Sequence, residues 1–332
     1  MLQPFSSARA EFTGEADVLL DANENPFDNG INRYPDPYQS ELKDKIAQWK
    51  AINKENIFLG NGSDEIIDIV IRTFCRPGLD TIRYLYPSFG MYKVMADIND
   101  IASNRVLLNE QFDFDIADAI GEQDDKDKLL FLCSPNNPTG NNLDRDKLIS
   151  CIEGFKGIVI IDEAYINFSN QESCLHLINE YSNLVVLQTF SKALGAAGLR
   201  IGMGFANPKI LAYMNKVKPP YNIGSQTQQK ALDVLSRIDE IDKENLSIIQ
   251  ERNKLVTRLQ ELSIVGKVYP SDANFLLVRF DNEQKVKNYL IDQKIIVRDR
   301  SKLLHCEGCL RLTIGTPTEN TRLIEALKSI VL

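Results

Sequence analysis

Short apolar runs that end in polar residues are the main pattern in the middle of the chain. They cover residues 129–133, 158–161 and 184–187, and are followed by SPNNPTG, DEAY and QTFSK, respectively. The runs are too short for buried helices and do not alternate, which is typical of strands covered on both faces. Helical segments between them indicate strand–helix–strand connections. The pattern predicts an α/β fold with a mostly parallel central sheet flanked by helices.

The segment before these runs has a different character. The stretch up to Tyr38 is rich in Asn, Asp and Pro, which favour turns, so we expect an extended arm. Leu42, Ile46 and Trp49 then recur at helical spacing and predict a helix.

The last third of the chain changes pattern again, from about Pro219. A long polar helical stretch leads to short strands near 274–280 and 310–314, and the chain ends in a helix at about 319–332. We therefore expect an N-terminal arm (1–38), a large domain (39–220) and a smaller α+β domain (221–332). The arm is expected to pack with the smaller domain.

Composition narrows the choice of partners. The chain has 332 residues, enough for a large domain and a smaller one, and 43% hydrophobic and 25% charged residues are ordinary for a globular protein. A net charge of −8 argues against a nucleic-acid partner, which needs a basic face. No window approaches the roughly 18 consecutive apolar residues of a membrane span, and the start lacks a secretory signal pattern. We expect a cytoplasmic protein.

The six cysteines are scattered, and the one close pair is the CxxC of Cys306 and Cys309 beside His305. A zinc or redox site needs further ligands or a strand–helix context. We therefore expect a reduced surface or core pair and no metal.

Lys192 is the candidate catalytic residue. An amine that forms an imine must be reachable, and small residues follow Lys192 in SKALGAAGLRIG, where another backbone can pass closely. By itself, a lysine is more often solvated on the surface. Its neighbours Thr189, Ser191 and Arg200 add hydroxyl donors and a fixed cation, a set that suits a phosphate.

A second group of donors precedes a predicted helix. Gly62, Ser63 and Asp64 lie where a loop becomes a helix, so their backbone N–H groups suit the same anion. Loops with Gly and Ser also serve as plain helix caps.

Three strand ends bring an amide, a carboxylate and an amine to one sheet edge, where ligands of open α/β sheets bind. These groups belong to Asn137, Asp162 and Lys192. Asp162 suits a protonated ring nitrogen, although a strand-end Asp is more often a helix cap or an ion-pair partner. Asn137 and Tyr165 suit a phenolic oxygen on the same ring, and NNPTG alone is equally compatible with a turn.

A bound ring also needs a stacking face. YPSFGMY places Phe89 and Tyr92 in a predicted loop, as stacking partners or as core residues.

The motifs together resemble the histidinol-phosphate aminotransferase family of fold type I pyridoxal-phosphate enzymes. The resemblance covers nearly the whole chain, through ANENP, RYPDP, GNGSDE, YPSFGMY, SPNNPTG, IDEAY, FSKALGAAGLRIG, VRDRS and CLRLTIGT. It implies pyridoxal 5′-phosphate as cofactor. The order and spacing of nine motifs carry the resemblance, since each one alone is short.

The resemblance implies a role for each matching residue at the cofactor ring. Lys192 would hold the cofactor as a Schiff base and later shuttle a proton. Asp162 would pair with the pyridine nitrogen, and Asn137 and Tyr165 would bind the phenolic oxygen. Phe89 would stack on the ring, where many relatives carry Tyr.

The cofactor phosphate would be held by a set of donors at the matching positions, namely Ser63, Asp64 (backbone), Thr189, Ser191 and Arg200. Tyr34 resembles the family tyrosine that reaches into the neighbouring subunit's site, next to cofactor and substrate. The resemblance thus implies a homodimer with shared active sites.

Substrate choice would depend on the second domain and the arm. Arg311 resembles the arginine that binds a substrate carboxylate, Arg298 the residue that reads the phosphate of histidinol phosphate, and Asn23 belongs to the same pocket. By itself, either arginine is also compatible with a plain exposed side chain at the edge of a strand. The implied reaction converts histidinol phosphate and 2-oxoglutarate into imidazole-acetol phosphate and glutamate, in ping-pong order.

Three alternatives stay open at this point. An aromatic amino-acid aminotransferase shares the cofactor site, threonine-phosphate decarboxylase is a related lyase, and a non-catalytic binding protein can share the fold. Lys192, Asp162, Asn137 and Arg200 argue against the last, since a binding protein does not need an imine-forming amine.

Overall fold

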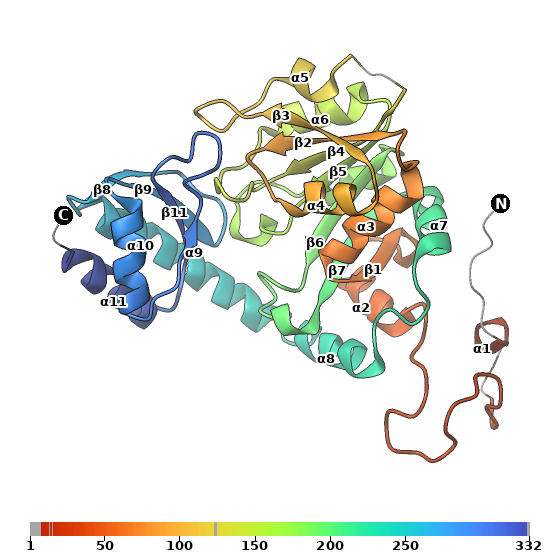
Figure 1. Cartoon of the computed structure of the whole chain (residues 1–332). Coiled ribbons are helices and arrows are strands. Elements are labelled where there is room, and N and C mark those ends of the chain that lie inside the picture. Colours follow the sequence, from red (N-terminus) through yellow and green to blue (C-terminus); the bar gives the residue numbers. More distant parts are fainter. Residues whose placement is uncertain (1–7, 13, 15, 123–124, 331–332) are drawn as a thin grey trace.

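The computed structural model describes residues 8–12, 14, 16–122 and 125–330 (Figure 1). A seven-stranded sheet forms its centre, in the order β1-β7-β6-β5-β4-β2-β3. All neighbouring pairs are parallel except those of β7, which runs opposite to β6 and β1. The strands are β1 (Ile57–Asn61), β2 (Thr81–Tyr86), β3 (Ala102–Leu107), β4 (Asp127–Cys133), β5 (Ile158–Asp162), β6 (Leu184–Thr189) and β7 (Ile201–Ala206).

The central strands β4, β5 and β6 are buried on both faces. In β5, Val159 and Ile161 join the core on one face, while Ile160 joins the core on the other. Because successive side chains point to opposite faces, the buried middle of each of these strands must be apolar on both faces. The three predicted apolar strands are therefore confirmed.

Helices cover both faces of this sheet. One core includes side chains of α2 (Ser40–Lys50), α5 (Ile116–Ile120), α6 (Arg145–Gly154), α8 (Ser225–Leu235) and the 3₁₀ segment η3 (Cys174–Asn179). The other includes side chains of α3 (Ser63–Phe74), α4 (Met91–Ile98) and α7 (Pro208–Val217). Short 3₁₀ turns complete this part of the chain, at η1 (Lys54–Asn56), η2 (Ile166–Phe168) and η4 (Ala197–Leu199).

A second, smaller sheet has its own core. Its strands lie in the order β10-β11-β9-β8 and all neighbours are antiparallel. They are β8 (Val265–Val268), β9 (Phe275–Phe280), β10 (Arg298–Asp299) and β11 (Cys309–Thr313). This core also takes side chains from α9 (Ile238–Gln260), α10 (Glu283–Asp292) and α11 (Pro317–Lys328). The predicted fold class, α/β with a smaller α+β part, is confirmed.

The polar stretch predicted as one long helix forms two helices, α8 and α9, which are separated at Ser236 and Arg237. Leu235 packs in the core of the large sheet, whereas Leu255 and Leu259 pack in the core of the small sheet. Helix α9 therefore extends from one sheet to the other (Figure 1). Among the described residues, no helix is long and apolar enough to cross a membrane.

The N-terminal arm has little regular structure beyond α1 (Ala8–Glu11) and projects from the start of α2 (Figure 1). Lys218 donates to the carbonyl of Pro37 (2.9 Å), and Tyr34 stacks on Tyr221 with ring centroids 4.5 Å apart. The described part of the arm thus lies beside the segment before α8, away from the smaller sheet. The predicted packing of the arm on the smaller domain stays a prediction. Residues 1–7 of the predicted arm lie outside the described residues.

Candidate active site

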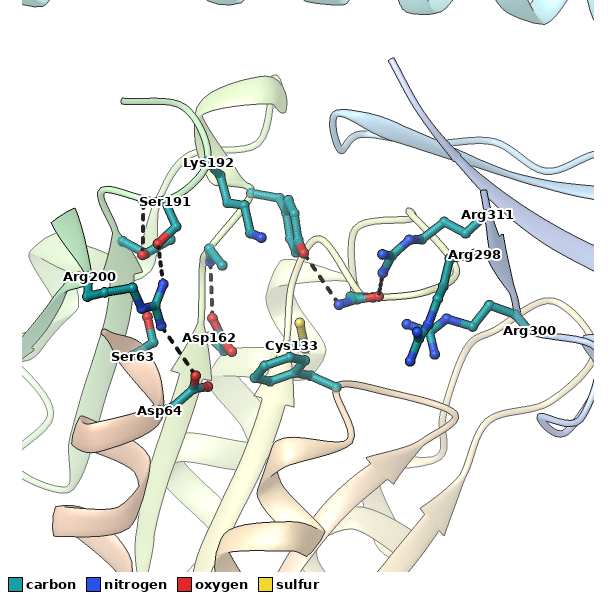
Figure 2. A pocket seen from close by; sticks show the side chains of 15 residues that line it. Ser63, Asp64, Cys133, Asp162, Ser191, Lys192, Arg200, Arg298, Arg300 and Arg311 are labelled. Carbon is teal, nitrogen blue, oxygen red and sulfur yellow. Dashed lines mark hydrogen bonds and ion pairs between the residues drawn. The ribbon is translucent and has the colours of Figure 1, made fainter. Parts of the chain in front are cut away.

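A cavity of about 410 Å³ opens where the large sheet faces the smaller one. Figure 2 shows the side chains that line it. They include every predicted site residue except Asn23 and Tyr34, namely Ser63, Asp64, Phe89, Asn137, Asp162, Tyr165, Thr189, Ser191, Lys192, Arg200, Arg298 and Arg311. Cys133, Ala164 and Arg300 complete the lining.

Parallel strands explain why these distant residues meet. Asp162 ends β5 and Thr189 ends β6, while Asn137 and Lys192 lie in the loops that follow β4 and β6. The strands are neighbours in register, with Cys133 opposite Asp162. Their carboxyl ends therefore share one edge of the sheet, where open α/β sheets bind ligands.

Lys192 reaches into the cavity from the loop after β6 (Figure 2). Its side chain stays accessible to solvent, and Nζ lies 5.7 Å from the centre of the Tyr165 ring. Surrounding protein atoms desolvate the ammonium group, and the positive charge of Arg311 adds to this, so the pKa of Lys192 is lowered. A lowered pKa leaves more of the amine neutral and nucleophilic.

Asp162 is a buried carboxylate with two hydrogen bonds. The Tyr92 hydroxyl donates to Oδ2 (2.7 Å) and the Ala164 N–H donates to Oδ1 (3.1 Å). Burial raises the pKa of Asp162, and these two donors act in the opposite direction. A protonated ring nitrogen in the cavity would supply the cation that this carboxylate lacks.

Tyr92 does not lie in a loop, as the sequence suggested, but in α4. It is fully buried and stacks on Phe131, with ring centroids 4.7 Å apart. Of the two aromatic candidates, only Phe89 lines the cavity. The spacing of the aromatic residues in YPSFGMY did not reveal which ring faces the cavity, because this depends on where α4 begins.

A hydrogen-bonded chain joins the two sheets across the cavity. Asn137 Nδ2 donates to the Tyr165 hydroxyl (3.4 Å), and Arg311 donates to Asn137 Oδ1 (2.5 Å). Burial raises the pKa of Tyr165 above its ordinary value, so its hydroxyl keeps its proton. The phenol and the amide are thus held together at one side of the cavity.

The other side of the cavity is a cradle of donors. Helix α3 begins at Ser63, so the first N–H groups of the helix are free of intrahelical partners. The Arg200 guanidinium lies within reach of Ser191 Oγ (3.4 Å) and Asp64 Oδ2 (3.5 Å). Thr189 Oγ1 lies at the same strand end. Hydroxyls, helix N–H groups and an arginine fork are the donor set of a phosphate site.

Close backbone packing shapes this cradle. A Cβ added to Gly202 would lie 2.5 Å from the Ser63 nitrogen, and a Cβ on Gly62, whose φ is +80°, would lie 2.6 Å from an Arg200 nitrogen. Both glycines let the β7 backbone and the arginine approach the helix start.

Pyridoxal 5′-phosphate fits this arrangement of groups. The cradle suits its phosphate, Asp162 its ring nitrogen, Asn137 and Tyr165 its phenolic oxygen, and Phe89 the face of its ring. Lys192 supplies the amine that its aldehyde needs. Fold and cavity together define a pyridoxal-phosphate-dependent enzyme of fold type I.

Comparisons with known proteins identify the family. Residues 15–327 match the model of the family described as aminotransferase class I and II. A histidinol-phosphate aminotransferase of Parabacteroides distasonis is 50% identical over 331 residues, which are 100% of this chain and 96% of the relative. One of Christiangramia forsetii is 48% identical over 332 residues, 99% of this chain and 95% of the relative. The chain belongs to the class I and II aminotransferases, and among them to the histidinol-phosphate aminotransferase family.

A solved structure agrees with this assignment. The crystal structure of the histidinol-phosphate aminotransferase from Clostridium acetobutylicum superposes with a TM-score of 0.82 at 27% identity, covering 90% of each chain. The chain is therefore a pyridoxal-phosphate-dependent aminotransferase.

Sequence reasoning missed three residues of the cavity. Cys133 and Ala164 flank predicted positions but carry no distinctive chemistry, so nothing in their pattern marked them. Arg300 had a usable signal, because it stands two residues after Arg298 and alternation in a strand places both side chains on one face. Asn23 and Tyr34 do not line the cavity of this chain.

Proposed function

We propose that the enzyme transfers the amino group of L-histidinol phosphate to 2-oxoglutarate, giving imidazole-acetol phosphate and glutamate, as a step of histidine biosynthesis. The main support for this substrate is a group of three arginines on the side of the smaller sheet. These arginines face Lys192 across the cavity and are Arg298, Arg300 and Arg311. Such a group suits substrates that carry a phosphate or two carboxylates. The relatives at 48–50% identity bear the name of this activity.

The residues of the large sheet would bind and orient the cofactor. When bound, pyridoxal phosphate supplies an electron sink and carries the amino group from one substrate to the other. Asp162 would keep the ring nitrogen protonated, because a buried carboxylate stabilises a neighbouring cation. Ser63, the Asp64 N–H, Thr189, Ser191 and Arg200 would hold the phosphate. Asn137 and Tyr165 would hold the phenolic oxygen, and Phe89 would cover the ring.

Lys192 would transfer the proton of the substrate. Its lowered pKa makes Nζ a better base near neutral pH than an ordinary lysine. With cofactor and substrate bound, Nζ would take the proton from the substrate carbon that bears the amino group and would give it back to complete the transfer. Lys192 Nζ lies 5.7 Å from the centre of the Tyr165 ring, at the cavity.

The smaller sheet and a neighbouring subunit would select the substrate. Arg311, held by Asn137, would bind a substrate carboxylate through its planar fork, and Arg298 would bind the phosphate. Asn23 and Tyr34 would enter the site of the other subunit of a homodimer. We further propose a cytoplasmic location, and a boundary between large and smaller domains near residue 220, with α8 packed back against the core of the large sheet.

A panel of amino donors with 2-oxoglutarate tests this function. We expect the highest kcat/KM for histidinol phosphate. A tenfold or greater preference for phenylalanine or tyrosine, about 1.4 kcal/mol in transition-state binding, would contradict it in favour of an aromatic aminotransferase. Release of carbon dioxide from phosphothreonine would contradict it in favour of the decarboxylase.

A further inference from the structure

Arg300 continues the pairing that places Arg298 and Arg311 at the cavity. In the small sheet Arg298 lies directly opposite Arg311, and Asp299 opposite Leu310. The Arg300 N–H donates to the Cys309 carbonyl (3.0 Å), which extends the same ladder by one residue. Alternation along the strand therefore puts Arg300 on the face of Arg298 and Arg311, toward the cavity (Figure 2).

The guanidinium of Arg300 has no hydrogen bond or ion pair among the residues that the structure describes, and its buried Nε has no partner. The adjacent carboxylate does not serve it, because Asp299 accepts from Lys287 Nζ (2.9 Å) and from Ser301. Arg311 differs, since it donates to Asn137 and lies over the Phe275 ring. A half-buried cation without an anion is costly unless a ligand supplies one.

The charged side chains that share the cavity face with Arg300 are the positive Arg311 and Arg298. Burial, and after it the positive charges of Arg311 and then Arg298, lower the pKa of Arg300 to about 10. The carboxylates that line the cavity, Asp64 and Asp162, belong to the large sheet, where the former pairs with Arg200 and the latter accepts from Tyr92. The arginine side therefore attracts an anion with more than one negative charge.

Arg300 also separates two spaces. It lines the main cavity together with Arg298 and Arg311, and it lines an adjoining cavity of about 150 Å³ that includes Ser88, Phe89 and Asn137. Its guanidinium thus forms part of the wall at the end of the substrate space, on the side opposite the cradle of Arg200 (Figure 2).

We propose that Arg300 is a specificity-determining residue that binds, together with Arg298, the terminal anion of the substrate and makes the pocket favour a phosphate dianion over a carboxylate. A phosphate offers three oxygens and two charges, enough for two guanidinium forks, whereas a carboxylate is satisfied by one. This inference rests on the proposed function, because it assumes a phosphorylated amino donor.

Arg300→Gln in the holoenzyme tests the proposal. We expect the KM for histidinol phosphate and the inhibition constant of inorganic phosphate to rise tenfold or more, with kcat changed less than threefold. The KM for 2-oxoglutarate should rise severalfold at most, and kcat/KM for unphosphorylated histidinol should not change. Arg300→Lys, which keeps the charge and loses the fork, should fall between Gln and wild type.

Lys302→Gln is the matched control, because it removes an exposed positive charge from the same loop, and Lys302 does not line the cavity. It should leave all these constants unchanged. Equal effects of Arg300→Gln on histidinol and histidinol phosphate, or no effect on either, would overturn the proposal. A wild-type enzyme that does not use histidinol phosphate would instead refute the proposed function. In that case, inhibition by inorganic phosphate against the true donor still tests Arg300.

Discussion

At the scale of single residues, the proposed chemistry of the cavity depends on how the buried carboxylate of Asp162 is oriented. Asp162 has no cationic hydrogen-bond partner among the described residues and is oriented by the Tyr92 hydroxyl and the Ala164 N–H. Tyr92 is itself fixed by packing, with its ring on Phe131 and no exposed surface. The phenol thus positions the carboxylate from behind, without touching the substrate space.

Removing the Tyr92 hydroxyl should make the Asp162 carboxylate easier to protonate. Tyr92→Phe takes away a donor that lowers the pKa of Asp162, so this pKa should rise further above its ordinary value. The carboxylate is lost as pH falls through its folded-state pKa, so the acid limb of the pH–kcat profile should move to higher pH. We also expect a loss of about 1.5–3 kcal/mol of stability, the usual contribution of a hydrogen bond to a charged group.

Tyr84→Phe is the control for that variant. Tyr84 is also buried and packs edge-on against Tyr92, but its hydroxyl accepts from Arg105 instead. It should leave the acid limb in place. If both variants shift the limb equally, or neither does, Tyr92 does not position Asp162.

Cavity residues could be predicted from the sequence only where a side chain with distinctive chemistry stands at the end of a strand. Lys192, Asp162 and Asn137 meet that condition, and the structure places all three at one cavity. Tyr92 was placed wrongly, because its position depends on where α4 begins, which is not visible in a linear sequence. Arg300 was missed although it alternates with Arg298, because only the pairing of β10 with β11 shows that this face of the strand meets the cavity.

At the scale of elements, the phosphate cradle is the place where β7 meets the start of α3. The Gly202 Cα lies so close to the helix that a Cβ would be 2.5 Å from the Ser63 nitrogen and 2.6 Å from the Gly62 carbonyl carbon. These are backbone atoms, so a side chain at 202 must displace the helix N-terminus.

Gly202→Ala should therefore weaken cofactor binding at least tenfold and destabilise the protein by about 1–3 kcal/mol through overpacking. Equilibrium dialysis of the apoenzyme against pyridoxal phosphate measures the first effect, and denaturant unfolding the second. Gly204→Ala is the matched control on the same strand, because its Cβ would meet only Ile66 side-chain atoms, at 3.2 and 3.7 Å, and Leu187 at 3.7 Å. Equal cofactor affinity in the two variants would contradict this account of the cradle.

Elements with a strong burial pattern could be predicted, and those determined by packing could not. The runs in β4, β5 and β6 are apolar because both faces of the strands are covered. The break between α8 and α9 has no Gly or Pro to mark it. It arises because Leu235 and Leu255 pack in different cores, which only the tertiary structure defines.

At the scale of the whole molecule, polar contacts hold the N-terminal arm together, while large apolar side chains of the arm stay exposed. Glu24 accepts from Arg9 (2.6 Å), Arg33 (2.8 Å) and the Tyr34 N–H (2.6 Å), and these contacts, Arg9 first, lower its pKa to about 2. Yet Leu20 is 87% exposed and Phe27 is 79% exposed. An ordered arm with uncovered apolar residues supports the proposed docking on a second copy.

Subunit mixing tests the shared site. Lys192→Ala chains have an intact arm, and Tyr34→Ala chains have an intact lysine, so a mixed dimer restores one complete site. Co-refolding the two variants should give a higher kcat/KM than either homodimer alone. Activity no greater than the sum of the two parents, or a wild-type chain that sediments as a monomer, would contradict the shared site.

The covalent attachment of the cofactor is the most direct test of the whole account. The purified wild-type enzyme, reduced with borohydride, digested and analysed by mass spectrometry, should carry the pyridoxyl group on the peptide that contains Lys192. Lys192→Ala should carry none and should lack the absorption band of the imine between lysine and cofactor. A wild-type enzyme without this band, or a pyridoxyl group on another lysine, would contradict the assignment of this cavity as the active site.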